Sequence, residues 1–153
     1  MYDLIIIGGG PAGTAAGVYA SRKQLKTLFI TADWGGQSTV SPDIHNWIGT
    51  PSISGTKLAS DLEGHLRAYA DTWVDIKDKT YVTSVEKTDA GHKVHFGQES
   101  AEATAILIAT GSKRRRLDEA SEGSFMHLSS AQKGLLWSES SKNQASTANF
   151  NKE

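Results

Sequence analysis

Short aliphatic runs and the segments between them organise the start of this chain. Residues 4–7 read Leu-Ile-Ile-Ile and lead directly into three glycines, which is typical of a strand buried on both faces. Residues 27–30 predict a second short strand, and residues 11–23 predict a helix that begins with proline, a residue suited to the first helical position. The small residues expected to pack this helix are Ala12, Ala15, Ala16 and Ala20. This pattern predicts a βαβ unit with a right-handed crossover.

A polar segment and a second helix follow. Residues 33–51 are rich in Gly, Ser, Thr, Asp and Asn and predict a long loop, and loops of this length in compact domains are usually functional. Residues 56–70 predict a helix, because leucines recur at every fourth position and form one apolar stripe. Residues 74–76 predict a weak strand.

The next part of the chain alternates between apolar and polar residues. Residues 81–86 and 93–96 flank a turn and predict an antiparallel hairpin. Residues 105–109, Ala-Ile-Leu-Ile-Ala, predict another strand buried on both faces. The order of elements predicts an α/β, Rossmann-like fold with a parallel sheet, helices and a small antiparallel hairpin layer.

The character of the chain changes after residue 117. Residues 118–153 lack regular apolar periodicity, apart from a short helix expected around residues 130–137, and they end in a polar stretch typical of disorder. We therefore expect one domain over residues 1–117, followed by a divergent tail.

Composition narrows the range of partners. The chain has 153 residues, with 16 Lys and Arg against 17 Asp and Glu, so its formal charge of −1 does not predict binding to nucleic acid or to a membrane surface. It has no cysteine, which excludes disulfides, thiolate metal sites and a dithiol relay within these residues. No apolar run reaches the roughly 20 residues of a membrane span, and we expect a cytoplasmic protein. His92 and His95 lie three apart on a predicted strand and should face opposite sides, so no metal site is expected.

The glycine-rich segment is the strongest chemical signal. Residues 8–13, Gly-Gly-Gly-Pro-Ala-Gly, match G-x-G-x-x-G directly after a strand and at the start of a helix. In this motif Gly8 makes the tight turn, Gly10 lets the backbone approach a pyrophosphate, and Gly13 lets the helix pack on the strand. The free N–H groups of the helix then face the phosphates. The alternative is a glycine-rich turn that binds nothing.

The ribose partner is less clear. An acidic residue is usual about twenty residues further on, at the end of the second strand. Thr31 and Ala32 occupy that place and Asp33 lies just beyond it. The contact should therefore come from Asp33, from Thr31 or from the backbone, which weakens the case for a plain NAD dehydrogenase.

Two short motifs in the long loop also suit a cofactor. Trp34-Gly35-Gly36-Gln37 opens the loop, and Ile44-His45-Asn46-Trp47 follows. The amides of Gln37 and Asn46 suit ribityl hydroxyls or a flavin edge, and paired glycines let a loop wrap an extended ligand. Ordinary turn chemistry remains the alternative.

In order along the chain, I-I-I-G-G-G-P-A-G-T-A-A, W-G-G-Q, I-H-N-W and I-L-I-A-T-G resemble the thioredoxin-reductase-like flavoproteins, a group that includes the flavin subunit of alkyl hydroperoxide reductase. The resemblance covers residues 2–117 and implies an FAD-binding domain. It places the pyrophosphate on the glycine motif, at Gly8, Gly10, Pro11, Ala12 and Gly13. It places the adenosine ribose near Thr31 and Asp33.

The same resemblance implies the remaining cofactor contacts. The adenine would be held through the backbone of Val82, and the flavin end would face Asn46. The residues expected to wrap the ribityl chain are Gly35, Gly36 and Gln37. The segment expected to return the chain to the FAD is Ala109, Thr110 and Gly111.

Relatives in this group continue into an NADPH-binding domain with a redox-active C-x-x-C, and then return to the flavin lobe. These 153 residues hold neither a second dinucleotide motif nor a cysteine. The family reaction would pass a hydride from NADPH to FAD and then electrons to a disulfide, and this chain offers no catalytic acid, base or nucleophile. Three hypotheses follow: an oxidoreductase domain completed by another chain or by a second copy, a binding module without turnover, or a truncated remnant.

Overall fold

The computed structural model describes residues 1–112. The boundary expected at residue 117, the tail and its short helix lie outside these residues. In chain order the elements are β1 (Tyr2–Gly9), α1 (Pro11–Arg22), β2 (Thr27–Trp34), the 3-10 helix η1 (Gly36–Val40), α2 (Gly55–Arg67), β3 (Val74–Lys77), β4 (Val82–Thr88), β5 (Gly91–Phe96) and β6 (Glu99–Ile108). No helix in this described part is long and apolar enough to cross a membrane.

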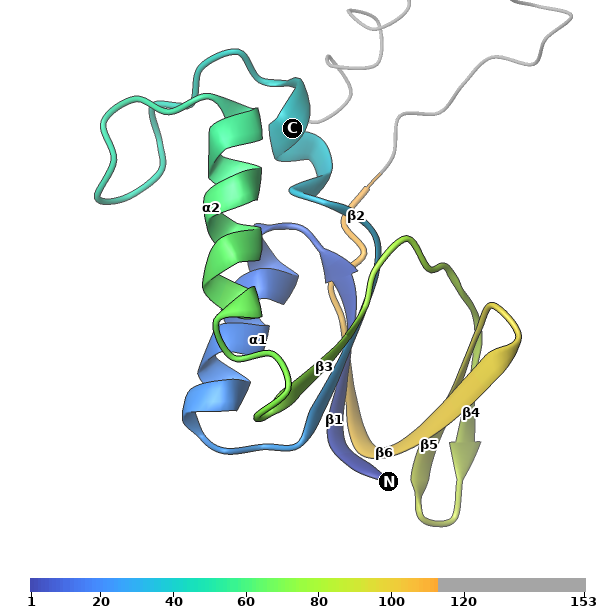
Figure 1. Ribbon diagram of the computed structural model, residues 1–153. Helices are drawn as coiled ribbons and strands as arrows, with labels where there is room; N and C mark the ends of the chain where they lie inside the picture. The colour runs from blue at the N-terminus through green and yellow to red at the C-terminus, as the bar shows by residue number, and fades with distance from the viewer. Residues whose placement is uncertain (113–153) are drawn as a thin grey trace, which may run out of the picture. The chain divides into compact units, whose positions relative to one another are not determined.

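All strands belong to one sheet with two characters. The strand order is β3-β2-β1-β6-β5-β4; the first four strands run parallel, and β6, β5 and β4 pair antiparallel. Figure 1 shows α1 and α2 together on one face of the parallel part, with β4 and β5 on the other side. This confirms the predicted α/β, Rossmann-like fold with a small antiparallel layer.

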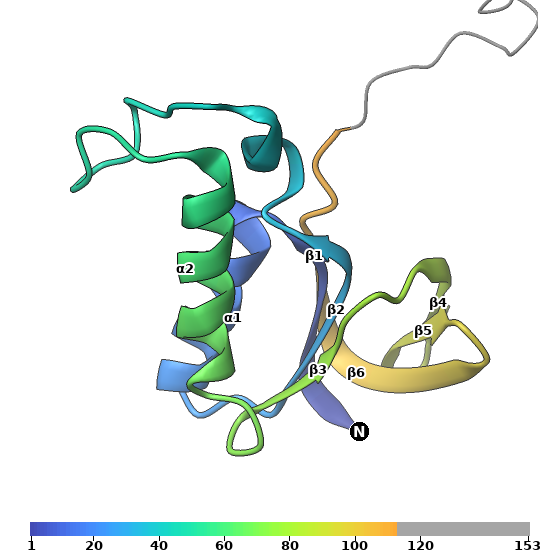
Figure 2. The same cartoon turned by 45° about the horizontal axis from the view of Figure 1, so that its top comes forward.

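Two apolar clusters separate these layers. Successive residues of a strand point to opposite faces, so Ile5 and Ile7 pack with Val94 and Phe96 of the hairpin. Ile6 joins the cluster under the helices, which includes Phe29, Val18, Leu66 and Val74. A triple-isoleucine strand therefore supplies both cores, as expected for a strand covered on both faces. Figure 2 shows the sheet between the helices and the hairpin.

The predicted loop over residues 33–51 is wrong at its start. β2 continues to Trp34, because its end stays paired with Gly9 of β1. Gly35 ends the strand in the left-handed region at φ 79°, and η1 follows. Thr31 and Asp33 therefore belong to the strand end itself.

The prediction that residues 105–109 are buried on both faces is also wrong. Leu107 is 36% exposed and Ile108 is 64% exposed. β6 begins at Glu99, and its first residues pair with β5, but from Ala105 to Ile108 the strand pairs only with β1. Within residues 1–112 no strand pairs with the other edge of this segment, so the apolar run does not become a buried strand in the part of the chain that the structure describes.

α2 packs through the predicted leucine stripe, with Leu58 and Leu66 buried, whereas α1 follows its predicted alanine face only in part, with Ala20 buried. Ala12 and Ala15 are exposed, so the predicted alanine face of α1 is wrong for them. The buried residues of α1 include Gly13, Thr14 and Gly17, and a Cβ at Gly17 would lie 2.8 Å from Leu66 Cδ1. Tight packing of α1 on α2 therefore depends on the absence of a side chain at that glycine.

Candidate functional site

A cavity of about 570 Å³ lies where β1, β2 and β6 reach their carboxyl ends. Ligands of open α/β sheets bind at this edge, and the volume lies within the usual range for small-molecule sites. Four segments line it: the glycine motif, the end of β2 with η1, the start of β4, and the residues after β6. The predicted site residues among them are Gly8, Gly10, Pro11, Ala12, Thr31, Asp33, Gly36, Gln37, Val82, Ala109, Thr110 and Gly111.

The three glycines of the motif play different parts. A Cβ at Gly13 would lie 1.9 Å from the carbonyl oxygen of Gly8, so this glycine lets α1 approach β1. Gly8 has a φ of 121°, and its Cβ would lie 2.3 Å from the carbonyl oxygen of Ala109. Gly10, in contrast, has nothing within 4 Å of its Cβ position. Gly8 and Gly13 therefore pack the turn, while Gly10 leaves open space beside the cavity.

The N-terminus of α1 faces this open space with backbone donors. Gly10 is the N-cap, and no side chain caps the helix. The N–H of Thr14 donates to the carbonyl oxygen of Gly10 at 3.0 Å, which leaves the earlier N–H groups of the first turn without a partner in the helix. Unpaired N–H groups and the positive end of the helix dipole favour an anion.

At the end of β2 the two candidate ribose residues differ. Thr31 is buried, and its hydroxyl donates to the carbonyl oxygen of Asp33. Asp33 is exposed and lines the cavity. It is the only carboxylate among the lining residues. Asp33 is therefore the better placed of the two to accept hydrogen bonds from a ligand.

Backbone bonds join the walls around the cavity. The N–H of Gly35 donates to the carbonyl oxygen of Gly9 at 2.8 Å, and the N–H of Thr80 donates to that of Thr31 at 3.0 Å. The N–H of Ala109 donates to that of Ile7 at 2.8 Å. The glycine loop, η1, the start of β4 and the end of β6 are thereby all tied to β1 or β2.

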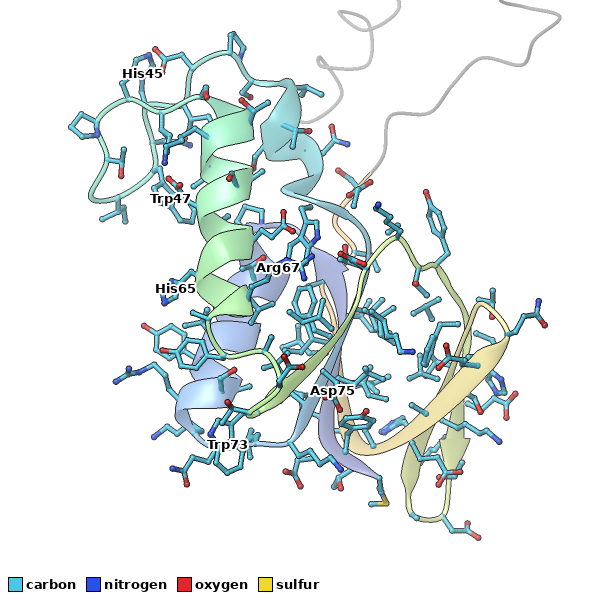
Figure 3. The ribbon with its side chains drawn as sticks, in the orientation of Figure 1. His45, Trp47, His65, Arg67, Trp73 and Asp75 are labelled. Atoms are coloured by element: carbon cyan, nitrogen blue, oxygen red, sulfur yellow. The ribbon has the colours of Figure 1, made fainter. Side chains whose placement is uncertain are left out.

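Three predicted site residues do not line the cavity. Gly13 packs inside the turn, and Gly35 is buried, with its Cβ position 2.3 Å from Ala59 Cβ. Asn46 is exposed on a separate arm, in which Ile44 pairs with Ile53 and Trp47 with Thr50. Figure 3 shows His45 and Trp47 on this arm, with Trp47 alongside the N-terminal half of α2.

Sequence reasoning missed several lining residues. They are Ile7, Gly9, Ile30, Ala32, Ser38, Thr39, Val40, Thr80, Tyr81 and Ser112. Gly9 carried a signal, since it lies inside the motif, and its Cβ would meet Thr31 Oγ1 and the carbonyl oxygen of Asp33, each at 2.4 Å. Thr80 and Tyr81 directly precede the predicted Val82, so the adenine-side segment extends two residues further back.

A cluster of charged side chains, Glu63, Arg67 and Asp78, lies outside the cavity lining. Arg67 Nε donates to Glu63 Oε1 at 2.8 Å, and Arg67 NH2 donates to Asp78 Oδ2 at 2.6 Å. The hydrogen bonds to Glu63 and then to Asp78 raise the pKa of Arg67. The hydrogen bond from Arg67 lowers the pKa of Asp78 below its ordinary value. Both partners are thus held in their charged forms at neutral pH.

Comparison with known proteins identifies the same family as the motifs. A family model described as pyridine nucleotide-disulphide oxidoreductase matches residues 2–144. Alkyl hydroperoxide reductase F of Escherichia coli (strain K12) is 31% identical over 125 residues, covering 81% of this chain and 24% of that relative. Its counterpart in Staphylococcus epidermidis is 34% identical over 119 residues, covering 76% and 23%. The chain therefore spans about a quarter of the length of these curated relatives.

Solved structures agree with the sequence comparison. Thioredoxin reductase of Lactococcus lactis superposes with a TM-score of 0.72 at 30% identity, over 81% of this chain and 41% of that one. Thioredoxin reductase of Streptococcus pyogenes superposes with a TM-score of 0.68 at 36% identity, over 76% and 37%. The chain belongs to the pyridine nucleotide-disulphide oxidoreductases, a family of FAD-binding flavoproteins, as a thioredoxin-reductase-like member corresponding to the N-terminal part of that fold.

Proposed function

We propose that the cavity at the carboxyl ends of β1, β2 and β6 holds FAD, and that the chain is the cofactor-binding part of a thioredoxin-reductase-like oxidoreductase. The observation that carries this proposal is the open space at Gly10, beside unpaired N–H groups at the start of α1. A diphosphate needs close approach to such donors, and any side chain at this position would project into its place.

Each wall of the cavity would then contact a different portion of FAD. Gly10, Pro11 and Ala12 hold the diphosphate, and Asp33 accepts hydrogen bonds from the adenosine ribose. The backbone at Val82 meets the adenine. Gly36 and Gln37 follow the ribityl chain, while Ala109, Thr110 and Gly111 close the side formed by β6. Gly13 and Gly35 act indirectly by shaping the turn and the loop.

Asn46 is the one proposed contact residue that lies on a separate arm and not in the cavity. Its predicted place is at the flavin end, and it lies on the exposed arm outside the cavity lining. For Asn46 to face the flavin, the isoalloxazine ring must extend out of the cavity toward the arm. The assignment of Asn46 remains a prediction.

FAD would supply the redox chemistry by accepting electrons from NADPH for transfer to a disulfide, and the residues described here bind and orient it. The NADPH site and the redox cysteines are expected from parts of such proteins that these 153 residues do not include. We therefore propose that turnover requires a further segment or a complementing chain that carries these parts. A homodimer could complete the walls of the FAD site, but a second copy would bring neither the NADPH site nor the cysteines. The cytoplasmic location expected from the sequence stays a prediction.

A second candidate function is a binding module without turnover. The lining residues contain one carboxylate, Asp33, and one phenol, Tyr81, and the chain has no cysteine. Such a set can position a nucleotide through hydrogen bonds. This function predicts that FAD binds and stabilises the fold, while the flavin stays oxidised in the presence of NADPH.

The visible spectrum of the purified chain separates these functions. FAD is titrated into the protein until the flavin band and the quenching of flavin fluorescence saturate, and NADPH is then added without oxygen. Because the NADPH site is expected outside these residues, NADPH is also added in the presence of a complementing chain that carries the remaining domain of a thioredoxin reductase. A flavin band that bleaches in that mixture supports an oxidoreductase, and a band that persists there supports a binding module. Absence of a bound flavin at saturating FAD overturns both.

A further inference from the structure

Arg67 is the last residue of α2 and makes three contacts with side chains from three different segments. It bonds to Glu63 within its own helix and to Asp78 beyond β3. Its guanidinium carbon also lies 5.3 Å from the centroid of the Trp34 ring at the end of β2. Figure 3 shows Arg67 between α2 and the sheet.

The contact with Asp78 leads to one wall of the cavity. The hydroxyl of Thr80 donates to the carbonyl oxygen of Asp78 at 2.8 Å. Thr80 also bonds through its N–H to Thr31, and residues 80–82 line the cavity. A shift of Asp78 would therefore move the segment proposed to meet the adenine.

The contact with Trp34 leads to a second wall of the cavity. The Trp34 ring stacks on Phe29 of the core, with centroids 5.4 Å apart and planes within 8°. The next residue, Gly35, bonds to the carbonyl oxygen of Gly9, and Gly36 and Gln37 line the cavity. A planar guanidinium next to an aromatic ring is attracted by the electrons of the ring, so Arg67 helps to hold this strand end.

We infer that Arg67 is a positioning residue for the cofactor, because its guanidinium ties together the two walls that are proposed to hold FAD. The inference rests on the proposed function and adds a residue outside the cavity that controls its width. The planar guanidinium of arginine suits this part, since its separate N–H groups bond to two different carboxylates and one face still lies over Trp34. A guanidinium stays protonated in proteins, so these contacts are not lost by titration of Arg67.

The expected effect is a loss of preorganisation. If the walls separate in some of the molecules, only the remaining fraction can bind FAD. The apparent dissociation constant for FAD then rises by the inverse of that fraction. The Arg67→Met variant keeps an unbranched apolar stem and removes every contact of the guanidinium. We expect its FAD dissociation constant to rise about tenfold, within the range typical of coupled sites.

Amide hydrogen exchange in the FAD-free protein measures directly how often each wall of the cavity opens. In Arg67→Met, the amides of Gly35 and Thr80 should both exchange faster. In Asp78→Asn, which leaves Trp34 untouched, the Thr80 amide should exchange faster while the Gly35 amide is unchanged. Lys57→Met is the matched control, since Lys57 pairs with Asp61 one turn along the same helix and neither residue lines the cavity.

The outcomes separate this inference from the proposed function. Faster exchange at both amides with weaker FAD binding in Arg67→Met, and neither change in Lys57→Met, supports it. Wild-type FAD affinity with unchanged exchange in Arg67→Met overturns the inference alone. If Arg67→Met does not fold, Asp78→Asn decides: an unchanged Thr80 amide and unchanged FAD affinity overturn it. Failure of the wild-type chain to bind FAD overturns the proposed function and the cofactor role of Arg67 together, even if the exchange of both amides rises.

Discussion

Two polar regions of this molecule differ in whether their polar groups already have hydrogen-bond partners. In the cavity, backbone N–H groups at the start of α1 lack partners, and glycine keeps the space beside them open. In the polar seam, which we define as Tyr2, Asp75, Lys77 and Glu99, the side chains satisfy one another. Tyr2 Oη donates to Asp75 Oδ2 at 2.7 Å, and Lys77 Nζ lies 2.9 Å from Glu99 Oε2. A region whose partners are internal stabilises the fold, whereas a region that leaves donors open is prepared for a ligand.

The largest effect is expected from adding a methyl group inside the turn beneath the cavity. In Gly13→Ala the new methyl group would overlap the carbonyl oxygen of Gly8, which is backbone and cannot move aside cheaply. We expect the free energy of unfolding to fall by about 3 kcal/mol, at the upper end of overpacking effects. Gly64→Ala is the matched control, because Gly64 lies in α2 with nothing within 4 Å of its Cβ position. That control should gain up to about 1 kcal/mol in denaturant unfolding. Equal stability of the two variants would contradict the packing assigned to Gly13.

The next effect concerns binding rather than folding. Gly10→Val places a branched side chain in the open space beside the N–H groups of α1. We expect FAD affinity to fall about a hundredfold, or about 2.7 kcal/mol, because the diphosphate loses its close approach. The melting temperature of the FAD-free protein should change by only a few degrees. Flavin fluorescence titration measures the first quantity and circular dichroism the second. Undiminished FAD binding by Gly10→Val would place the diphosphate elsewhere.

The different local character of the two regions explains how much of the site could be predicted. The glycine motif was readable because a tight turn, a close approach and a helix contact each require a glycine at a fixed spacing. Local sequence patterns also predicted several elements: the strands β1 and β2, the helix α1 and the hairpin. The local signal at Arg67 is only its i, i+4 spacing from Glu63, which predicts an ordinary helix ion pair. Its other two partners are not local, since Asp78 is 11 residues away and Trp34 ends β2.

The wrong predictions share a cause in tertiary structure. An apolar run has the same sequence whether or not a neighbour covers it, so the exposure of Leu107 and Ile108 had no sequence signal. The extension of β2 to Trp34 depends on its pairing with Gly9, which the composition of the loop does not reveal.

The polar seam should respond to alkaline pH. Burial, followed by the hydrogen bond to Asp75, raises the pKa of Tyr2 from 10.0 to about 12. Folding therefore favours the neutral phenol, so this contribution to stability is complete below pH 10 and is lost as the pH rises toward about 12. Tyr2→Phe should lose about 1 kcal/mol at neutral pH and show a flatter decline between these values. Urea unfolding across this pH range measures both, and a decline as steep as in the wild type would contradict the assignment. FAD affinity should not change.

The smallest effect is expected at the ion pair of the polar seam. Lys77 Nζ lies within 3.0 Å of both carboxylate oxygens of Glu99, but the two side chains are 42% and 62% exposed. Water and salt screen such pairs, so Lys77→Met should change the free energy of unfolding by no more than about 0.5 kcal/mol. Glu99→Gln and the double variant complete a cycle whose coupling energy should shrink in high salt. All three variants should bind FAD as the wild type does, because neither residue lines the cavity. A weaker FAD complex in any of them would mean that the polar seam and the cavity are coupled. The contrast between a region whose side chains bond to one another and a region whose donors are open to a ligand would then be wrong.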